Sequence, residues 1–436
     1  MVVNSMSYAT YDSYKDSGVD WLGEIPSDWD LIPNKHIFKL KNIKVGKKSS
    51  EYDLLSLTLK GVIKRDMENP EGKFPAEFDT YQEVKNGNFI FCMFDVQETP
   101  RTVGLSKFDG MITGAYTVFD VNENYNRDFL YYFYLNLDLD KRLKPLYRGL
   151  RNTIPKEWFL NFKTFVPSFK QQKAIANFLD DKTAQIDQAI ALKQQQIEKL
   201  GEYKQIVIQN AVTKGLNPNA PMKNSGVEWI GNIPEHWDVK KLKYLTSKVG
   251  SGITPSGGAT TYVDKGIPLL RSQNIHFDGL VLDNVANISL NVHKSMKNSQ
   301  VKQHDVLLNI TGGSLGRCCY NSSNDEMNVN QHVCIVRPNN LIKGEFLNGL
   351  MSSEVGQKQI WFFQQGGGRE GLNFQNLKNF DFPLPSIDEQ KEIIAHIEIL
   401  KQHFKKSVDN YQTQIDRLKE YKNILINQAV TGKIKI

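Results

Sequence analysis

The sequence lacks the features that mark several large classes of protein. No run approaches the roughly 18 uninterrupted apolar residues that a membrane-spanning helix needs. Residues 1–14 have neither an apolar signal-peptide core nor a small-residue cleavage site. The four cysteines have no C-x-x-C spacing and suit neither a disulfide framework nor a zinc site; they are Cys92, Cys318, Cys319 and Cys334. We therefore expect a cytoplasmic protein with buried, reduced thiols.

Familiar catalytic motifs are missing too. The glycine-rich segment 312–317 has the wrong spacing and no lysine for a phosphate-binding P-loop. The eight histidines form no H-E-x-x-H motif, and no Asp- or Asn-Pro-Pro-aromatic loop of an amino-methyltransferase occurs. Nothing places the carboxylate pairs Asp95/Glu98 and Asp381/Asp388 in a cleft. We therefore expect a binding protein with no active site, metal or cofactor of its own.

What the chain has is enough apolar material for two or three cores. It contains 436 residues, of which 40% are hydrophobic and 23% charged. The formal net charge is +6, which allows a polyanionic partner without requiring one.

The chain also contains an internal repeat. Residues 17–31 (SGVDWLGEIPSDWDL) and 225–239 (SGVEWIGNIPEHWDV) share nine of fifteen positions at an offset of 208. Residues 197–213 (IEKLGEYKQIVIQNAVT) and 415–431 (IDRLKEYKNILINQAVT) share ten of seventeen at an offset of 218. A period this long excludes a solenoid and indicates duplication of a whole domain with its tail.

The repeated tails predict two long helices. Ser168-x-x-Gln171 and Ser386-x-x-Glu389 each follow a proline and are typical of a capping box. Apolar residues then recur at spacings of three and four, which predicts a coiled-coil seam interrupted by Lys193 and Lys204. The seam residues are Leu179, Ile186, Ile190, Ile197, Leu200 and Val207 in the first tail and Ile397, Phe404, Val408, Tyr411, Ile415, Leu418 and Leu425 in the second.

Two similar long helices most simply bury their seams against each other, which predicts an antiparallel coiled coil with pseudo-twofold symmetry. The alternative is that each helix packs only on its own domain or on a partner protein. Short apolar runs bounded by turn residues, such as 87–91 and 305–308, predict that the two bodies are strand-rich α+β domains. The expected segments are a leader (1–16), a first domain (17–166), a central helix (167–216), a second domain (217–384) and a distal helix (385–436).

Glycine-rich loops with polar and basic side chains in these bodies have the inventory for nucleic-acid binding. Arginine can bind guanine bidentately, Asn and Gln can bind adenine, and glycines let backbone amides approach phosphates. The candidates in the first body are Lys44, Lys47, Arg101, Thr102, Lys107, Tyr116, Arg148 and Arg151. Those in the second are Thr254, Ser256, Arg271, Ser272, Gln273, Asn274, Thr311, Ser314, Arg317, Gln331, His332 and Arg369. For any one of them, the alternative is an ordinary solvated turn residue.

Taken together, these motifs resemble the specificity subunit of type I restriction-modification systems. The resemblance covers nearly the whole chain from about Tyr14. It rests on the doubled S-G-V-[DE]-W-[LI]-G-x-I-P-x-x-W openings, the Pro-Ser-x-x-[EQ]-Gln-Lys helix starts and the doubled E-Y-K-x-x-x-I-x-x-A-V-T ends. The second body carries T-P-S, L-R-S, T-G-G-S-L-G-R, N-Q-H and G-R segments that look like recognition segments. The first body lacks most of them, and only Arg151, aligned with Arg369, transfers directly.

The resemblance implies two target-recognition domains that each read half of a split DNA site, with the helices setting the gap. It implies double-stranded DNA, two methyltransferase subunits and restriction/translocase subunits as partners. S-adenosylmethionine, ATP and Mg would then be bound by those partners. Two alternatives stay open, namely a specificity subunit of a methyltransferase-only system and a coiled-coil scaffold whose variable domains bind proteins.

Overall fold

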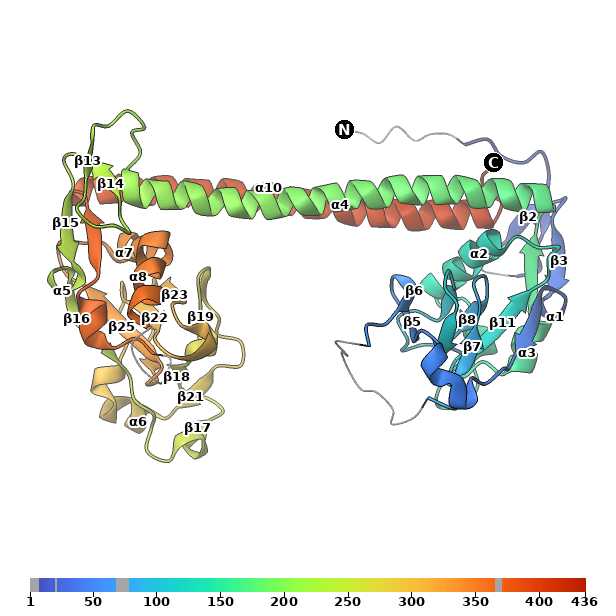
Figure 1. Ribbon diagram of the computed structural model, residues 1–436, viewed down its shortest axis with the longest axis horizontal. Coiled ribbons are helices and arrows are strands. Elements are labelled where there is room, and N and C mark those ends of the chain that lie inside the picture. The colour runs from blue at the N-terminus through green and yellow to red at the C-terminus, as the bar shows by residue number, and fades with distance from the viewer. Residues whose placement is uncertain (1–7, 20–21, 68–77, 365–370) are drawn as a thin grey trace. The chain divides into compact units, whose positions relative to one another are not determined.

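The computed structural model describes residues 8–19, 22–67, 78–364 and 371–436 (Figure 1). Trp21 of the first repeated opening and the candidate Arg369 lie outside these residues. The chain forms two compact units. Unit 1 comprises Met1–Gln194 with Gln412–Ile436, and unit 2 comprises Gln195–Tyr411. These units cut across the linear segments expected from the sequence, because each contains parts of both long helices.

Unit 1 is built from short strands, short helices and parts of the two long helices. Its strands are β1 (Tyr14–Asp16), β2 (Glu24–Pro26), β3 (Asp30–Pro33), β4 (Phe38–Lys41), β5 (Leu55–Thr58), β6 (Gly61–Lys64), β7 (Gln82–Val84), β8 (Phe89–Phe91), β9 (Val103–Leu105), β10 (Gly110–Ile112), β11 (Thr117–Val121) and β12 (Lys163–Val166). Its short helices are α1 (Asn34–Ile37), η1 (Gly46–Glu51), α2 (Arg127–Leu139), η2 (Lys144–Leu146) and α3 (Lys156–Asn161).

Unit 2 has the same kind of composition. Its strands are β13 (Met222–Asn224), β14 (Asn232–Pro234), β15 (Asp238–Lys241), β16 (Thr246–Ser251), β17 (Tyr262–Val263), β18 (Ile267–Leu270), β19 (Ile275–His276), β20 (Gly279–Leu280), β21 (Ala286–Ile288), β22 (Val306–Asn309), β23 (Cys318–Tyr320), β24 (Asn328–Val329), β25 (Val333–Pro338) and β26 (Asp381–Leu384). Its short helices are α5 (Leu242–Leu245), η3 (Gly258–Thr261), η4 (Ser272–Asn274), α6 (Leu290–Ser295), η5 (Lys297–Ser299), η6 (Gly312–Ser314), α7 (Gly344–Ser352), α8 (Glu354–Gln364) and α9 (Phe374–Lys378).

Each unit contains a four-stranded antiparallel sheet with the same strand order. In unit 1 the order is β4-β11-β8-β9, and in unit 2 it is β16-β25-β22-β23. Each unit also pairs the strand that follows its opening motif with the strand before its long helix, β3 with β12 and β15 with β26. The bodies therefore share a topology although they share few residues, and the expected α+β class is confirmed.

The sheets are buried by different kinds of side chain. Unit 1 packs aromatic rings together, including Phe38, Phe91 and Phe159, whose ring centres lie 4.8–6.0 Å apart. Unit 2 fills the equivalent space mainly with aliphatic residues of its sheet and of α7. Because similar folds can be filled by different residue types of suitable volume, sequence identity between the bodies is low.

The three cysteines of unit 2 lie in its sheet, and they are fully buried and free. Cys318 and Cys319 lie in β23 and Cys334 in β25, and Cys92 of unit 1 is also buried. The expectation of buried thiols is confirmed.

The long helices begin where their capping signals predict. Helix α4 spans Phe169–Lys214 and α10 spans Ile387–Val430. At α4 both halves of the capping box form: the Gln171 amide N–H donates to Ser168 Oγ, and Gln171 Oε1 accepts from the Ser168 amide at 3.0 Å. At α10 only Ser386 caps, because the Glu389 carboxylate instead accepts from Trp237 Nε1 at 3.0 Å.

The helices pair antiparallel, as Figure 1 shows. In unit 1, Lys422 Nζ lies 2.6 Å from Asp187 Oδ2 and Lys193 Nζ donates to Gln414 Oε1 at 2.5 Å. In unit 2, the rings of Tyr203 (α4) and Phe404 (α10) lie 5.9 Å apart. The seam residues are buried at Leu179, Ile186, Ile397, Ile415 and Leu425 and half-buried at Ile190, Ile197, Leu200, Val207, Phe404, Val408, Tyr411 and Leu418. The antiparallel pairing is confirmed, and the pseudo-twofold symmetry stays a prediction.

The repeated openings and the repeated tails pack against each other within each unit. Trp29 and Trp237 are fully buried. A Cβ on Gly432, which follows α10, would lie 3.3 Å from Trp29 Cζ2, and a Cβ on Gly215, which follows α4, would lie 3.3 Å from Trp237 Cζ2. Both glycines have positive φ, +69° and +75°. The C-terminal end of each long helix thus packs against the opening motif of the same unit.

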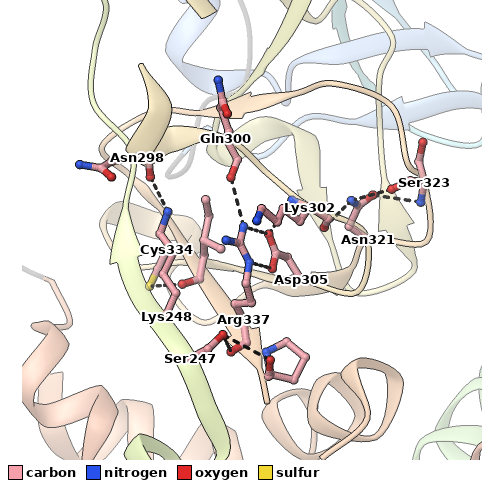
Figure 2. A network of polar contacts seen from close by, with 12 residues as sticks. Ser247, Lys248, Asn298, Gln300, Lys302, Asp305, Asn321, Ser323, Cys334 and Arg337 are labelled. Carbon is pink, nitrogen blue, oxygen red and sulfur yellow. Dashed lines mark hydrogen bonds and ion pairs between the residues drawn. The ribbon is translucent and has the colours of Figure 1, made fainter. Parts of the chain in front are cut away.

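A buried ion pair anchors one edge of the unit 2 sheet (Figure 2). The fully buried Asp305 accepts hydrogen bonds from Arg337 Nε at 2.7 Å, from Arg337 Nη2 at 2.8 Å and from the Lys302 amide at 2.7 Å. Arg337 Nη2 also donates to the Gln300 carbonyl. Burial beside Arg337 lowers the pKa of Lys248, whose Nζ donates to the Asn298 carbonyl at 2.6 Å. This network lies at the end of the sheet where β25 ends. The loops described next lie at the opposite end of the strands, which we call the loop edge.

Candidate nucleic-acid interface

The recognition segments of unit 2 converge at one edge of its sheet. Because neighbouring strands are antiparallel, the end of β16, the start of β25 and the end of β22 meet there. The loops that begin at these points contain T-P-S (254–256), N-Q-H (330–332) and T-G-G-S-L-G-R (311–317). We call this set the unit 2 loop cluster.

Four predicted residues of these loops form one chain of polar contacts. Thr254 Oγ1 donates to Gln331 Oε1, Gln331 Nε2 lies 3.0 Å from His332 Nε2, and His332 Nδ1 lies 2.7 Å from Thr311 Oγ1. A neutral imidazole that accepts at Nε2 from the Gln331 amide carries its proton on Nδ1 and donates it to Thr311. The Thr311 hydroxyl and the second Gln331 amide N–H then remain donors for a ligand. The chain therefore presents neutral donors that suit base edges.

The L-R-S segment joins the same cluster through Asn309. Asn309 Nδ2 donates to the Ser272 carbonyl at 2.9 Å and to Ser314 Oγ at 3.1 Å. The guanidinium of Arg271 lies 5.9 Å from the ring centre of Tyr262, and Arg271 is half-buried. The structure thus brings Ser272 and Ser314 together at this edge.

The prediction that Asn274 contacts DNA is wrong, because its side chain is buried. Its Oδ1 accepts from the Arg271 amide at 2.9 Å and its Nδ2 donates to the Val281 carbonyl at 2.8 Å. The side chain shapes the turn that carries Arg271, and no donor is left facing solvent. The remaining candidates Ser256, Gln273 and Arg317 are exposed on the loops.

Unit 1 has an equivalent loop cluster at the corresponding edge of its sheet. It consists of the segments after β4 (42–48), between β8 and β9 (92–102) and before β11 (113–116). Lys44 pairs with Gln82, whose Nε2 donates to the Tyr116 carbonyl at 2.7 Å. A cavity of about 350 Å³ at this edge is lined by Lys44, Tyr116 and Lys156, among others. Lysines beside an aromatic ring suit a nucleic-acid backbone and base.

The tight turn 148–153 joins this cluster and carries two of the three predicted arginines of unit 1. The guanidinium of Arg148 lies 3.7 Å from the ring centre of Trp158. Arg151 donates to Asp95 through Nε at 3.1 Å and Nη2 at 2.5 Å, and its guanidinium lies 5.7 Å from the centre of the Phe94 ring. This contact holds the pKa of the Asp95 carboxyl below its ordinary value. The guanidinium of Arg148 therefore stacks on an aromatic ring, whereas the guanidinium of Arg151 is already paired with the Asp95 carboxylate.

The prediction for Thr102 is also wrong. It was predicted from its loop position to contact DNA, but it is 5% exposed and its Oγ1 donates to Asp138 Oδ1 at 2.5 Å. Its amide also donates to Asp138 Oδ2 at 2.9 Å, and Lys141 completes the network at 2.7 Å. Thr102 therefore fastens the start of β9 to α2. Its neighbour Arg101 is half-buried and donates to the Leu59 carbonyl at 3.3 Å, whereas Lys47 and Lys107 are exposed.

Two residues that shape or line the unit 1 loop cluster were not predicted from the sequence. Lys156 begins α3 and lines the unit 1 cavity, and its place directly after Pro155 in a turn-rich stretch was the available signal. Asp138 gave no signal, because it lies in the middle of an apolar helix and its partner Thr102 is 36 residues away.

Other kinds of site are missing from the part of the chain that the structure describes. Across residues 8–19, 22–67, 78–364 and 371–436, no group of three or more His, Cys, Asp or Glu side chains is arranged to hold a metal ion. Among the helices described, none combines the length and apolarity needed to cross a membrane.

Comparison with known proteins points to one family. Residues 234–420 match the Methylase_S family, described as the type I restriction modification DNA specificity domain. The EcoBI specificity subunit of Escherichia coli is 29% identical over 266 residues, which cover 58% of this chain and 55% of the relative. The MjaVIII specificity subunit of Methanocaldococcus jannaschii is 26% identical over 319 residues, which cover 71% of each chain. The chain thus spans about half the length of the E. coli relative.

Solved structures agree in fold. A chain from a structural study of complex assembly and conformational transition of the type I R-M system matches with a TM-score of 0.65 and 12% identity, covering 93% of this chain and 98% of that one. The HsdS subunit from Thermoanaerobacter tengcongensis matches with a TM-score of 0.52 and 14% identity, covering 94% and 98%. At these identities the likeness concerns the fold alone. Residues 234–420 therefore match the type I restriction modification DNA specificity domain, and the chain as a whole is similar in sequence and fold to type I restriction-modification specificity subunits.

Proposed function

We propose that the chain recognises a bipartite, asymmetric DNA site, with each unit reading one half through its loop cluster. The observation that carries the proposal is the polar chain from Thr254 through Gln331 and His332 to Thr311. It links three loops that are separate in the sequence and leaves hydrogen-bond donors on one edge of a sheet. Base edges in the grooves of DNA present acceptors that such donors can read.

The two clusters differ in chemistry, so the two half-sites should differ in sequence. Unit 2 presents mainly neutral hydroxyl and amide groups, whereas unit 1 presents Lys44, Lys156 and Arg148 beside aromatic rings. Contacts from lysine and arginine to phosphates fix position, and contacts to base edges provide specificity. Unit 1 is therefore expected to depend more strongly on salt than unit 2.

In this proposal the paired helices α4 and α10 set the unread gap between the half-sites and dock two methyltransferase subunits. Restriction/translocase subunits would complete the nuclease. The chain itself performs no chemistry, and S-adenosylmethionine, ATP and Mg are held by the partner subunits. This part rests on the similarity to type I restriction-modification specificity subunits and on the length of the two helices.

The test is modified-base sequencing of DNA from a methylation-free host that expresses the chain with its cognate methyltransferase subunit. The proposal expects two different short half-sites with a fixed gap and one methyladenine in each half. Expression of the methyltransferase subunit alone is the control and should give no such motif. An unsplit methylated site would mean that one unit alone reads DNA. No new methylation from an associated, soluble complex would contradict the proposal.

A further inference from the structure

Leu150 stands out in unit 1 because none of the residues that the structure describes covers its side chain. Its side chain is fully exposed, at 104% of the reference surface. Leucine is usually buried, and the other exposed leucines of this unit retain less surface, such as Leu192 at 54%. The whole Leu150 side chain is therefore available to contact a ligand.

The backbone around Leu150 is held tightly. The Asn152 amide donates to the Gly149 carbonyl at 3.2 Å, which places Leu150 at the second position of a tight turn. Arg148 and Thr153 exchange two backbone hydrogen bonds, at 2.8 and 3.0 Å, at the base of this turn. Gly149 supplies the positive φ of +68° that the turn needs. The leucine is thus displayed at an ordered apex.

The turn is fastened to the loop cluster of unit 1. The Asp95 amide donates to the Arg151 carbonyl and the Ile154 amide donates to the Met93 carbonyl, both at 2.8 Å. The side chains of Asp95 and Arg151 add a second link. Because Met93 and Asp95 follow β8 directly, the apex belongs to the edge that is proposed to face DNA.

Cationic groups flank the apolar side chain. Arg148 precedes the turn, with its guanidinium 3.7 Å from the centre of the Trp158 ring and its Nη1 bonded to the Pro145 and Tyr147 carbonyls at 3.1 and 2.6 Å. Arg151 lies directly after Leu150; its side chain is 70% exposed, and it is paired with Asp95. An apolar protein partner would leave the Arg148 guanidinium facing an apolar surface. DNA offers phosphates to Arg148 and base faces to the leucine.

We propose that Leu150 is a wedge that enters a groove of double-stranded DNA and unstacks one base step of the half-site read by unit 1. Apolar side chains that insert between base pairs do so beside cationic contacts to the backbone, and the unstacking is offset by the added contact surface. The inference rests on the proposed DNA-recognition function. By the repeat offset of 218, Leu150 corresponds to Gly368 in the sequence of unit 2. The distortion is therefore expected in one half-site only.

The test uses the full chain and duplexes that carry its methylated motif, with 2-aminopurine placed in turn at each position of both half-sites. Binding is followed by fluorescence anisotropy of a separate end label. We expect 2-aminopurine fluorescence to rise severalfold at one position of the unit 1 half-site. Leu150→Ala should abolish that rise and weaken binding about tenfold, which corresponds to about 1.4 kcal/mol. Leu192→Ala, an exposed leucine on α4, is the matched control and should change neither.

Each other outcome separates the wedge from the function on which it rests. Absence of sequence-specific binding by the unaltered chain would overturn the proposed function itself. Specific binding with equal fluorescence for Leu150→Ala and the unaltered chain would overturn the wedge alone. Leu150→Ala that binds DNA normally but fails to bind the methyltransferase subunit would assign Leu150 to a protein interface and also overturn the wedge. Because Leu150 is fully exposed, thermal unfolding of the variant should be unchanged.

Discussion

The hydroxyl of Thr311, two residues after β22, lies 2.7 Å from Nδ1 of His332, which directly precedes β25. This contact joins two recognition loops and orients the imidazole toward Gln331. Thr311→Val removes the hydroxyl at constant volume and should relax specificity in the unit 2 half-site by about 1–3 kcal/mol at one base pair. The measurement is modified-base sequencing with the methyltransferase partner, in which one half of the motif should become degenerate.

Thr311→Ser is the matched control, because it keeps the hydroxyl, and it should leave the motif unchanged. Ser322→Ala offers a second control, since Ser322 is exposed at the opposite end of the neighbouring strand β23. Degeneracy in both half-sites for Thr311→Val would show that the two units do not read separately.

The Asp305–Arg337 pair should dominate the stability of unit 2. Asp305→Ala leaves the guanidinium of Arg337, whose side chain is 21% exposed, without its two carboxylate contacts. Breaking a buried pair in this way costs about 3–5 kcal/mol. Chemical denaturation should report that loss, whereas Lys358→Ala, in an ion pair whose side chains are 60% and 59% exposed, should cost about 0–1 kcal/mol. Equal effects of the two variants would contradict a structural role for the network.

The buried thiols should make the protein less stable in alkali. Burial raises the pKa of Cys319 and of Cys334 from 9.0 to about 12. Above pH 9 the unfolded chain loses these protons and the folded chain keeps them, so the stabilisation is complete below pH 9 and is lost as the pH rises toward 12. Each thiol contributes a slope of at most about 1.4 kcal/mol per pH unit.

Unfolding followed at several pH values from 8 to 10.5 measures this slope. Cys334→Ala should flatten it by the share of one thiol, and an unchanged slope would contradict the assignment. Native protein at pH 8 should also resist alkylation at both cysteines until it is unfolded.

Local signals in the sequence predicted the helices well. The Ser168–Gln171 cap and the heptad seam involve neighbours within one or two helical turns, so the start of α4 and its buried face could be read directly. The polar chain of unit 2 was predicted as a set of residues, but the contact between Thr311 and His332 depends on strand pairing between β22 and β25. No local pattern specifies that pairing.

Errors arose where a distant residue decides the environment. Thr102 lies at a strand end, as a recognition residue would, but Asp138 in α2 buries it. The shared strand order of the two sheets could not be predicted from the sequence for a related reason. Phe38 and Phe91 fill the space beside the sheet in unit 1, and aliphatic residues fill the equivalent space in unit 2. Volume and patterning specify these cores, and residue identity does not.

The contact between Gly432 and the opening motif predicts a sensitive glycine. A Cβ at this position would lie 2.4 Å from Pro26 Cδ, and φ is +69°. Gly432→Ala should therefore cost backbone strain of about 1–2 kcal/mol plus the clash. Gly18→Ala is matched in φ, at +69°, but has no neighbour within 4 Å, so it should show the strain alone. Denaturation midpoints should fall further for Gly432→Ala, and equal shifts would exclude a contribution from the contact with Pro26.

The proposed role of the helices in setting the gap predicts how the DNA motif responds to their length. Seven residues inserted after Lys193 and seven after Thr413, whose neighbour Gln414 faces Lys193, preserve the heptad register of both helices. At 1.5 Å per residue the insertion adds about 10 Å, and at about 3.4 Å per base pair this corresponds to about three base pairs. Modified-base sequencing should therefore find both half-sites unchanged and the gap longer by about three. Seven residues inserted in α4 alone would disrupt the pairing and should abolish methylation. A motif that keeps its original gap with both insertions would mean that the helices do not set the spacing.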